Sequence, residues 1–169
     1  MVMASGCSLP LPREKALSPG PWTCDSDADE ALKGHDYEKA IRLHERLLAI
    51  QPDNGLALYH LGYAYGQVGD HLKEVLYYEK ATSLGYKTAN IYFNMGMAYG
   101  ELDNKERAIA AFSNSLEMDP GNIDAMIYLG MLYSEIGKKQ EARNQLRKVL
   151  DIDPNNSMAQ KLLKDIKRK

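Results

Sequence analysis

The chain has 169 residues, of which 44% are hydrophobic and 26% are charged, and its formal net charge is −2. These values are typical of a globular domain, and the acidic total argues against a nucleic-acid-binding protein. No apolar run approaches the roughly 18 residues that a membrane-spanning helix needs. The length suits one compact domain or one short repeat array.

Residues 1–24 differ from the rest of the chain, because prolines and glycines prevent a continuous helix and no hydrophobic period is present. We therefore predict a flexible, Pro-rich arm. Cys7 and Cys24 both precede the helical part of the chain and form neither a CxxC motif nor a zinc set. The interrupting residues of the arm are Gly6, Pro10, Pro12, Pro19, Gly20 and Pro21.

Helical periodicity begins after the arm. Asp25 or Ser26 can cap a short helix that Gly34 ends, and a second helix follows it. We read this pair as a degenerate first repeat, residues 25–54. Its first helix is degenerate because Asp27 stands where the later copies have leucine or methionine.

Three further stretches superimpose at a constant offset of 34 residues. Each has an aliphatic residue, then a glycine, and a tyrosine three residues after the glycine. This period predicts helical hairpins at residues 55–88, 89–122 and 123–156. The matching triplets are Leu61, Gly62 and Tyr65; Met95, Gly96 and Tyr99; and Leu129, Gly130 and Tyr133.

The repeated small residues have a steric explanation. Two helices joined by a short turn pack closely only where small side chains lie at their crossing. Proline stops the second helix, and an asparagine after it can cap the next one. Glu74 breaks the pattern, because it replaces an alanine and must find a partner or loosen its hairpin. The matched residues are Ala40, Ala108 and Ala142; Pro52, Pro120 and Pro154; and Asn54, Asn122 and Asn156.

Residues 157–169 are predicted to form a capping helix with a basic tail. A terminal helix of this kind covers the apolar face that the last hairpin would otherwise expose. Its apolar residues are Met158, Leu162, Leu163 and Ile166.

Together these positions resemble the tetratricopeptide repeat family. The resemblance implies an all-α fold, a short right-handed solenoid of antiparallel helical hairpins with a C-terminal capping helix. It also implies a non-catalytic scaffold or adaptor that binds other proteins, rather than an enzyme.

The residues themselves also argue against catalysis, which needs converging titratable groups. The four histidines fall at unrelated positions of the repeat, and we interpret them as satisfied or surface side chains. No catalytic residue, metal ligand or cofactor is therefore expected. These histidines are His35, His44, His60 and His71.

In members of this family, the first helices of successive repeats line a concave groove, and certain positions face the ligand. The resemblance transfers these positions to twelve residues of this chain. Among them, the pairs Tyr59/Tyr63, Phe93/Met97 and Ile127/Met131 are four residues apart and share a face. They form a second apolar stripe, and the Gly-x-x-Tyr core faces a different way. We interpret this stripe as not needed to hold the hairpins together. The transferred residues are Leu56, Tyr59, Tyr63 and Gln67; Asn90, Phe93, Met97 and Glu101; and Asp124, Ile127, Met131 and Glu135.

The chemistry of these positions bears on the ligand. Family members that hold the acidic C-terminal tails of heat-shock chaperones use a clamp of lysine, arginine and asparagine, of which only Asn94 is reminiscent here. An aromatic and Met-rich groove with an acidic rim at Glu101, Asp124 and Glu135 instead suits an apolar or amphipathic peptide or helix that carries basic residues.

Two alternatives remain open. The arm, with Leu9, Leu11 and Trp22, or another copy of the protein could cover the groove. The charge is also uneven: residues 25–55 hold eight acids and four bases, whereas residues 138–169 hold ten bases and four acids. Such asymmetry would suit head-to-tail self-association of arrays.

The segment from Met3 to Ser8 looks like the end of a bacterial lipoprotein signal, in which a small residue precedes the cysteine that is acylated, here Cys7. The basic and apolar regions of such a signal are not present. Either the match is accidental or the sequence starts inside the signal. An acylated Cys7 would anchor a periplasmic scaffold that assists envelope or pilus assembly. Without acylation we expect a cytoplasmic protein.

Overall fold

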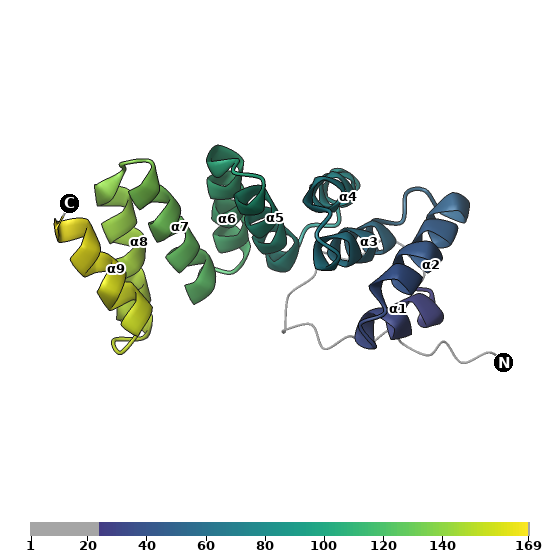
Figure 1. Ribbon diagram of the computed structural model, residues 1–169, viewed down its shortest axis with the longest axis horizontal. Coiled ribbons are helices and arrows are strands. Elements are labelled where there is room, and N and C mark those ends of the chain that lie inside the picture. Colours follow the sequence, from purple (N-terminus) through teal and green to yellow (C-terminus); the bar gives the residue numbers. More distant parts are fainter. Residues whose placement is uncertain (1–23, 169) are drawn as a thin grey trace. The chain divides into compact units, whose positions relative to one another are not determined.

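The computed structural model describes residues 24–168, and the regular structure in that range is entirely α-helical (Figure 1). The predicted all-α fold is confirmed. The predicted arm, with Cys7, lies outside the described residues except for Cys24, an exposed free cysteine. The helices are α1 (Ser26–Lys33), α2 (Tyr37–Ile50), α3 (Gly55–Gln67), α4 (His71–Ser83), α5 (Ala89–Glu101), α6 (Lys105–Met118), α7 (Ile123–Glu135), α8 (Lys139–Ile152) and α9 (Ser157–Arg168).

The chain divides into two compact units, which we call unit 1 (residues 1–88) and unit 2 (residues 89–169). Unit 1 contains α1 to α4 and unit 2 contains α5 to α9. Within each unit every helix packs against the next one along the chain, and α9 contacts α7 as well as α8. Among the described helices, none is both long enough and apolar enough to cross a membrane.

Sharp turns inside the hairpins depend on one residue in the left-handed region. Gly69 and Gly137 have φ values of 81° and 79° at equivalent positions of the 34-residue repeat. The other copies place His35 and Asp103 there, with φ values of 59° and 52°. Glycine enters this region without steric cost, whereas other residues are strained in it. The turn geometry is therefore kept even where its preferred residue is absent.

The predicted asparagine caps are confirmed. The side-chain oxygen of Asn54 accepts a hydrogen bond from the backbone N–H of Ala57 at 3.0 Å. Asn122 and Asn156 make the equivalent bonds at 2.9 and 3.0 Å. Asp25 caps α1 as expected, accepting from two backbone N–H groups. Each cap satisfies an N–H group that has no partner within its helix.

The repeated glycines lie where helices cross closely. A Cβ atom on Gly62 would lie 2.7 Å from the ring of Tyr78, and one on Gly96 would lie 2.7 Å from the ring of Phe112. Such distances are shorter than any real Cβ contact, so no larger residue fits without displacement. The matched alanines of the second helices, Ala40, Ala108 and Ala142, are fully buried.

Glu74 takes the alanine position in unit 1 and finds a partner. Its side chain is buried, and its Oε2 lies 2.8 Å from Nδ1 of His71. The carboxylate lies over Gly66 of α3, where a Cβ atom would come within 2.5 Å of it. The absence of a side chain at position 66 therefore makes room for the carboxylate.

We predict that Gly66→Ala has opposite effects in two backgrounds. In the native chain the added methyl group displaces the buried carboxylate from its contact with His71. A buried polar group that loses its partner costs about 1–3 kcal/mol. With Glu74→Ala the methyl group meets open space and gains up to about 1 kcal/mol of helix propensity. Urea unfolding of the four proteins of this double-mutant cycle measures the difference. A change in the free energy of unfolding that has the same sign in both backgrounds would contradict the prediction.

Helix α9 closes the last hairpin of unit 2. Ala159 and Ile166 are buried against a cluster that includes Leu146 and Val149 of α8, and Leu162 and Leu163 pack against it. Met158 was expected on this face, but half of its side chain is exposed. The contact face of α9 therefore begins one residue later, at Ala159.

Candidate functional site

The residues predicted to line a groove lie on α3, α5 and α7. Tyr59 is buried, whereas the others reach the surface to different extents. The half-buried ones are Leu56, Tyr63, Asn90, Phe93, Met97, Ile127 and Met131, and the exposed ones are Gln67, Glu101, Asp124 and Glu135.

In unit 1 much of this stripe is used for internal packing. Tyr59 is only 8% exposed and stacks on Tyr78 of α4, with ring centroids 5.8 Å apart. Tyr63 packs against the core of α1 and α2, and its ring lies 6.4 Å from that of Tyr37. Burial and the neighbouring Tyr37 raise the pKa of Tyr63. The interpretation that the stripe is not needed to hold the hairpins together is therefore wrong for α3.

The same correction applies to Phe93 in unit 2. Its ring meets that of Phe112 edge-on at 5.5 Å and that of Tyr128 at 5.9 Å. Phe112 and Tyr128 stack with centroids 5.3 Å apart. These three rings pack α5, α6 and α7 together, so Phe93 takes part in internal packing as well as reaching the surface.

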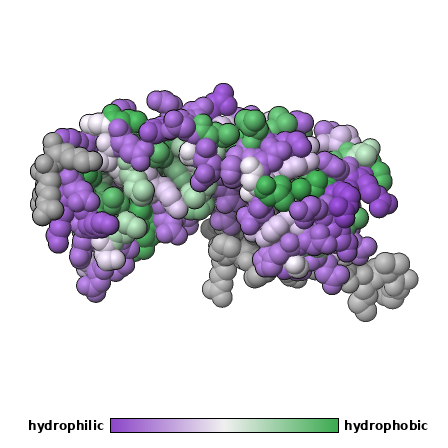
Figure 2. Space-filling model, in the orientation of Figure 1, coloured by the Kyte–Doolittle hydropathy of each residue, from purple (hydrophilic) through white to green (hydrophobic). Residues whose placement is uncertain are grey.

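Between α5 and α7, unit 2 is hollowed. The hollow has a volume of about 120 Å³ and an apolar lining. Apolar side chains also reach the surface over α7 among hydrophilic ones in Figure 2. Four of the predicted groove residues line the hollow, together with the stacked rings. The lining consists of Gly96, Met97, Gly100, Glu101, Phe112, Tyr128, Met131, Leu132 and Glu135.

The two carboxylates at the hollow differ in their surroundings. Oε2 of Glu135 lies 3.1 Å from the ammonium group of Lys105, which is also 3.7 Å from Asp103. The hydrogen bond and charge of Glu135 raise the pKa of Lys105. Glu101 is exposed and forms no ion pair within residues 24–168. The uncompensated negative charge at the hollow is therefore that of Glu101.

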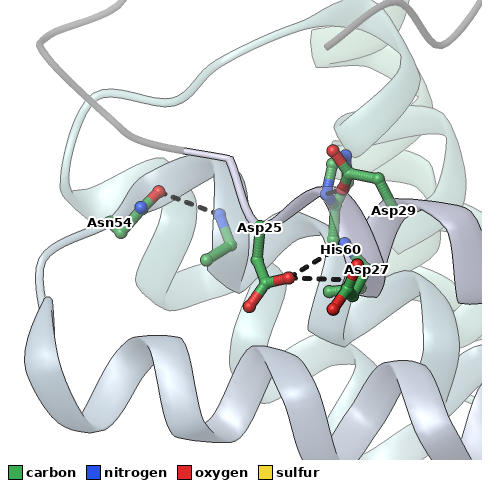
Figure 3. Close-up of polar contacts among 7 residues, drawn as sticks. Asp25, Asp27, Asp29, Asn54 and His60 are labelled. Carbon is green, nitrogen blue, oxygen red and sulfur yellow. Dashed lines mark hydrogen bonds and ion pairs between the residues drawn. The ribbon is translucent and has the colours of Figure 1, made fainter. Parts of the chain in front are cut away.

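A second group of functional side chains lies inside unit 1 and was missed by sequence reasoning. Asp29 of α1, His44 of α2 and His60 of α3 are all buried, and each offers a ligand atom within 4.8 Å of the other two. Figure 3 shows Asp29 beside His60, with Asp25 nearby at the start of α1. We call these three residues the buried His/Asp cluster.

The polar contacts within the cluster, all of whose residues the structure describes, do not include the imidazole of His44. Oδ1 of Asp29 lies 3.0 Å from Nδ1 of His60. His44 is 1% exposed, and neither of its ring nitrogens has a hydrogen-bond partner within the described residues. An unpartnered buried polar group costs about 1–3 kcal/mol. The interpretation of the histidines as satisfied or surface side chains is wrong for His44.

Burial first, and then the neighbouring His60, lower the pKa of His44 to about 4, against the opposing charges of Asp29 and Asp25. The imidazole is therefore neutral at neutral pH. The repeat itself marks this position as unusual. The other copies fill it with buried apolar residues, namely Tyr78, Phe112 and Leu146.

Two segments match models of one family, described as tetratricopeptide repeat, over residues 27–85 and 103–166. Together they cover more than half of the chain. The chain belongs to the tetratricopeptide repeat family. Proteins of this family are generally non-catalytic scaffolds that bind protein or peptide partners, and this tetratricopeptide repeat protein is such a scaffold. No curated protein sequence matches the chain significantly.

Solved tetratricopeptide repeat structures share the fold. A crystal structure of MamA is 25% identical, with a TM-score of 0.78 over 85% of this chain and 84% of MamA. YrrB, described as a tetratricopeptide repeat protein with an unusual peptide-binding site, is 19% identical, with a TM-score of 0.78 over 82% and 72% of the two chains. A repeat protein from Parabacteroides merdae is 20% identical, with a TM-score of 0.75 over 83% of this chain and 57% of the other.

Proposed function

We propose that this tetratricopeptide repeat scaffold binds a peptide or helix at the hollow of unit 2. One apolar side chain of the ligand enters between Met97 and Met131, and a neighbouring lysine or arginine meets Glu101. The observation that carries the proposal is an apolar hollow with an uncompensated carboxylate at its edge.

The size of the hollow supports a single anchoring side chain. Its volume of about 120 Å³ is close to that of an engineered apolar cavity of about 150 Å³ that accepts benzene. A leucine, methionine or phenylalanine side chain is of this scale. The two methionines can adjust to the shape of an apolar ligand, because the thioether side chain is unbranched and flexible.

The charges favour a basic neighbour for that anchor. Lys105 already pairs with Glu135, whereas Glu101 forms no ion pair in the described part of the chain. An acidic ligand would meet Glu101 without compensation, and like charges at an interface reduce affinity. The ligand class is therefore apolar with basic residues, as distinct from an acidic tail.

The decisive experiment is peptide selection on the full chain followed by affinity measurement. We expect a displayed random library to yield an apolar residue beside lysine or arginine. Met131→Ala should then lower the affinity for the best peptide about 5- to 30-fold, since truncating a central anchor contact costs about 1–2 kcal/mol. Glu101→Gln should lower the affinity for this peptide by a smaller factor than Met131→Ala does. The loss caused by Glu101→Gln should be larger at low salt than at high salt.

Met118→Ala is the matched control. Met118 lies at the end of α6, is 40% exposed and does not line the hollow. It should leave the affinity unchanged. Equal effects of Met118→Ala and Met131→Ala would show that the hollow is not the binding site. Removal of residues 1–24 tests whether the arm covers the hollow. An affinity for the peptide that rises on deletion would mean that the arm competes with the peptide for the hollow.

A further inference from the structure

We propose that the buried His/Asp cluster of unit 1 is a binding site for a divalent transition-metal ion of the zinc class. Two imidazoles and one carboxylate are ligands that such ions prefer. The site goes beyond the proposed peptide binding, because it lies in the other unit and shares no residue with the hollow.

The geometry allows the three side chains to hold one ion. Their ligand atoms lie within 4.8 Å of one another, whereas ligands of a tetrahedral zinc ion at about 2.1 Å lie about 3.4 Å apart. The widest separation therefore needs to close by no more than about 1.4 Å, and Oδ1 of Asp29 and Nδ1 of His60, now 3.0 Å apart, need to open slightly. Small side-chain rotations provide both movements. Three protein ligands leave a fourth position for a water molecule.

The imidazole of His44 also indicates a bound ion. It is almost fully buried within the cluster, and both of its ring nitrogens are without a hydrogen-bond partner in residues 24–168. Buried polar groups are nearly always paired, so an orphaned imidazole needs an explanation. A metal ion supplies the partner.

The charge of the site is also suitable. Asp29 contributes one negative charge, and Asp25 lies close enough to act electrostatically on His44. Asp25 remains committed to capping α1 through its Oδ1. A divalent ion at the cluster is therefore largely neutralised without an additional ligand.

The cluster also lies in the copy of the repeat that has the shortest first helix. The three ligands come one each from α1, α2 and α3, and α1 has only eight residues. At the position of His44 the later copies use apolar contacts between helices instead. A bound ion would join these three helices and would compensate for the polar residues that interrupt the apolar core. Its expected role is structural.

The test is zinc binding to the full chain, followed by calorimetry and thermal unfolding. We expect one zinc ion per chain and an unfolding midpoint that rises with zinc concentration, because a ligand that binds only the folded state stabilises it. Magnesium should have no effect, since it favours octahedral oxygen ligands. Absence of zinc binding would overturn the proposal.

Variants locate the ion. His44→Leu and Asp29→Asn should each lower zinc affinity by at least about 10- to 100-fold, the loss seen even for groups that only support metal ligands. His35→Gln and Cys24→Ser are the controls, because both residues are exposed zinc-binding types outside the cluster. Unchanged affinity in His44→Leu, or loss of binding in a control, would place the ion elsewhere.

X-ray absorption on the zinc-loaded native chain tests the site without any substitution. We expect a first shell of nitrogen and oxygen at about 2.0–2.1 Å that includes two imidazoles. A sulfur shell at about 2.3 Å would assign the zinc to cysteine and overturn the proposal. This measurement decides the question even if a variant fails to fold.

Discussion

Metal-free protein should lose about 3 kcal/mol of stability through His44 alone as the pH falls from about 6.5 to about 4. The folded state holds the pKa of His44 near 4, whereas the unfolded chain has the ordinary value of 6.5. Between about pH 4 and pH 6.5, the unfolded state therefore binds a proton at His44 that the folded state does not bind. The cause is burial of the imidazole first, then the neighbouring His60.

The sign follows from proton linkage. Stability rises with pH wherever the unfolded state binds more protons than the folded state. Above pH 6.5 both states leave His44 neutral and the effect vanishes, and below pH 4 both protonate it and the loss levels off. Carboxylates titrate in the same range, and Asp29 and Asp25 face His44 with the opposite effect on its pKa.

Comparison with His44→Leu isolates the contribution of His44. Leucine is similar in volume, and Leu146 fills the equivalent position of the last hairpin without exposure. The variant should be more stable at pH 7 by about 1–3 kcal/mol, because it removes an unpartnered buried polar group. Urea unfolding at several pH values, with a chelator present, measures both proteins. Parallel pH profiles would show that His44 titrates normally.

The scaffold could be predicted from sequence because its determinants are local and repeated. Asn54, Asn122 and Asn156 cap helices through backbone groups three residues away. Gly62 and Gly96 mark crossings that recur at a fixed interval. Each copy of the repeat confirms the others, so a single sequence contains several independent observations of the same feature.

The buried His/Asp cluster could not be predicted from spacing, because its three members lie on three helices at unrelated positions of the repeat. One pattern was available, however. His44 stands where Tyr78 and Phe112 stand in later copies, and a histidine in an otherwise apolar core position indicates a polar neighbour. Its neighbours depend on how α1 and α3 pack, which only the structure shows.

The candidate binding surface was predicted in part. The transferred positions include Met97, Met131 and Glu101, which the structure places at one hollow. The family pattern treats all copies as equal, and so it did not show that Tyr59 is buried by Tyr78. It also did not show that Lys105 of the neighbouring helix neutralises Glu135. Such contacts depend on residues that differ between copies.

The second large effect is expected at Gly96, where α5 crosses α6. An alanine Cβ would lie 2.7 to 2.8 Å from three ring carbons of Phe112. That ring is 2% exposed and packs against Phe93 and Tyr128, so any displacement of it disturbs both contacts. Overpacking of this kind costs about 1–3 kcal/mol or more, against about 1 kcal/mol gained in helix propensity. We expect a net loss of stability.

Gly100→Ala gives the matched control in the same helix. A Cβ at Gly100 meets no atom within 4 Å, so this variant should be stabilised by up to about 1 kcal/mol. Thermal unfolding of the two variants should therefore move in opposite directions. Because the displaced ring of Phe112 lines the hollow, Gly96→Ala should also lower the affinity for the selected peptide under conditions in which the protein remains folded. Stabilisation by both substitutions would show that α5 and α6 are not in close contact at Gly96.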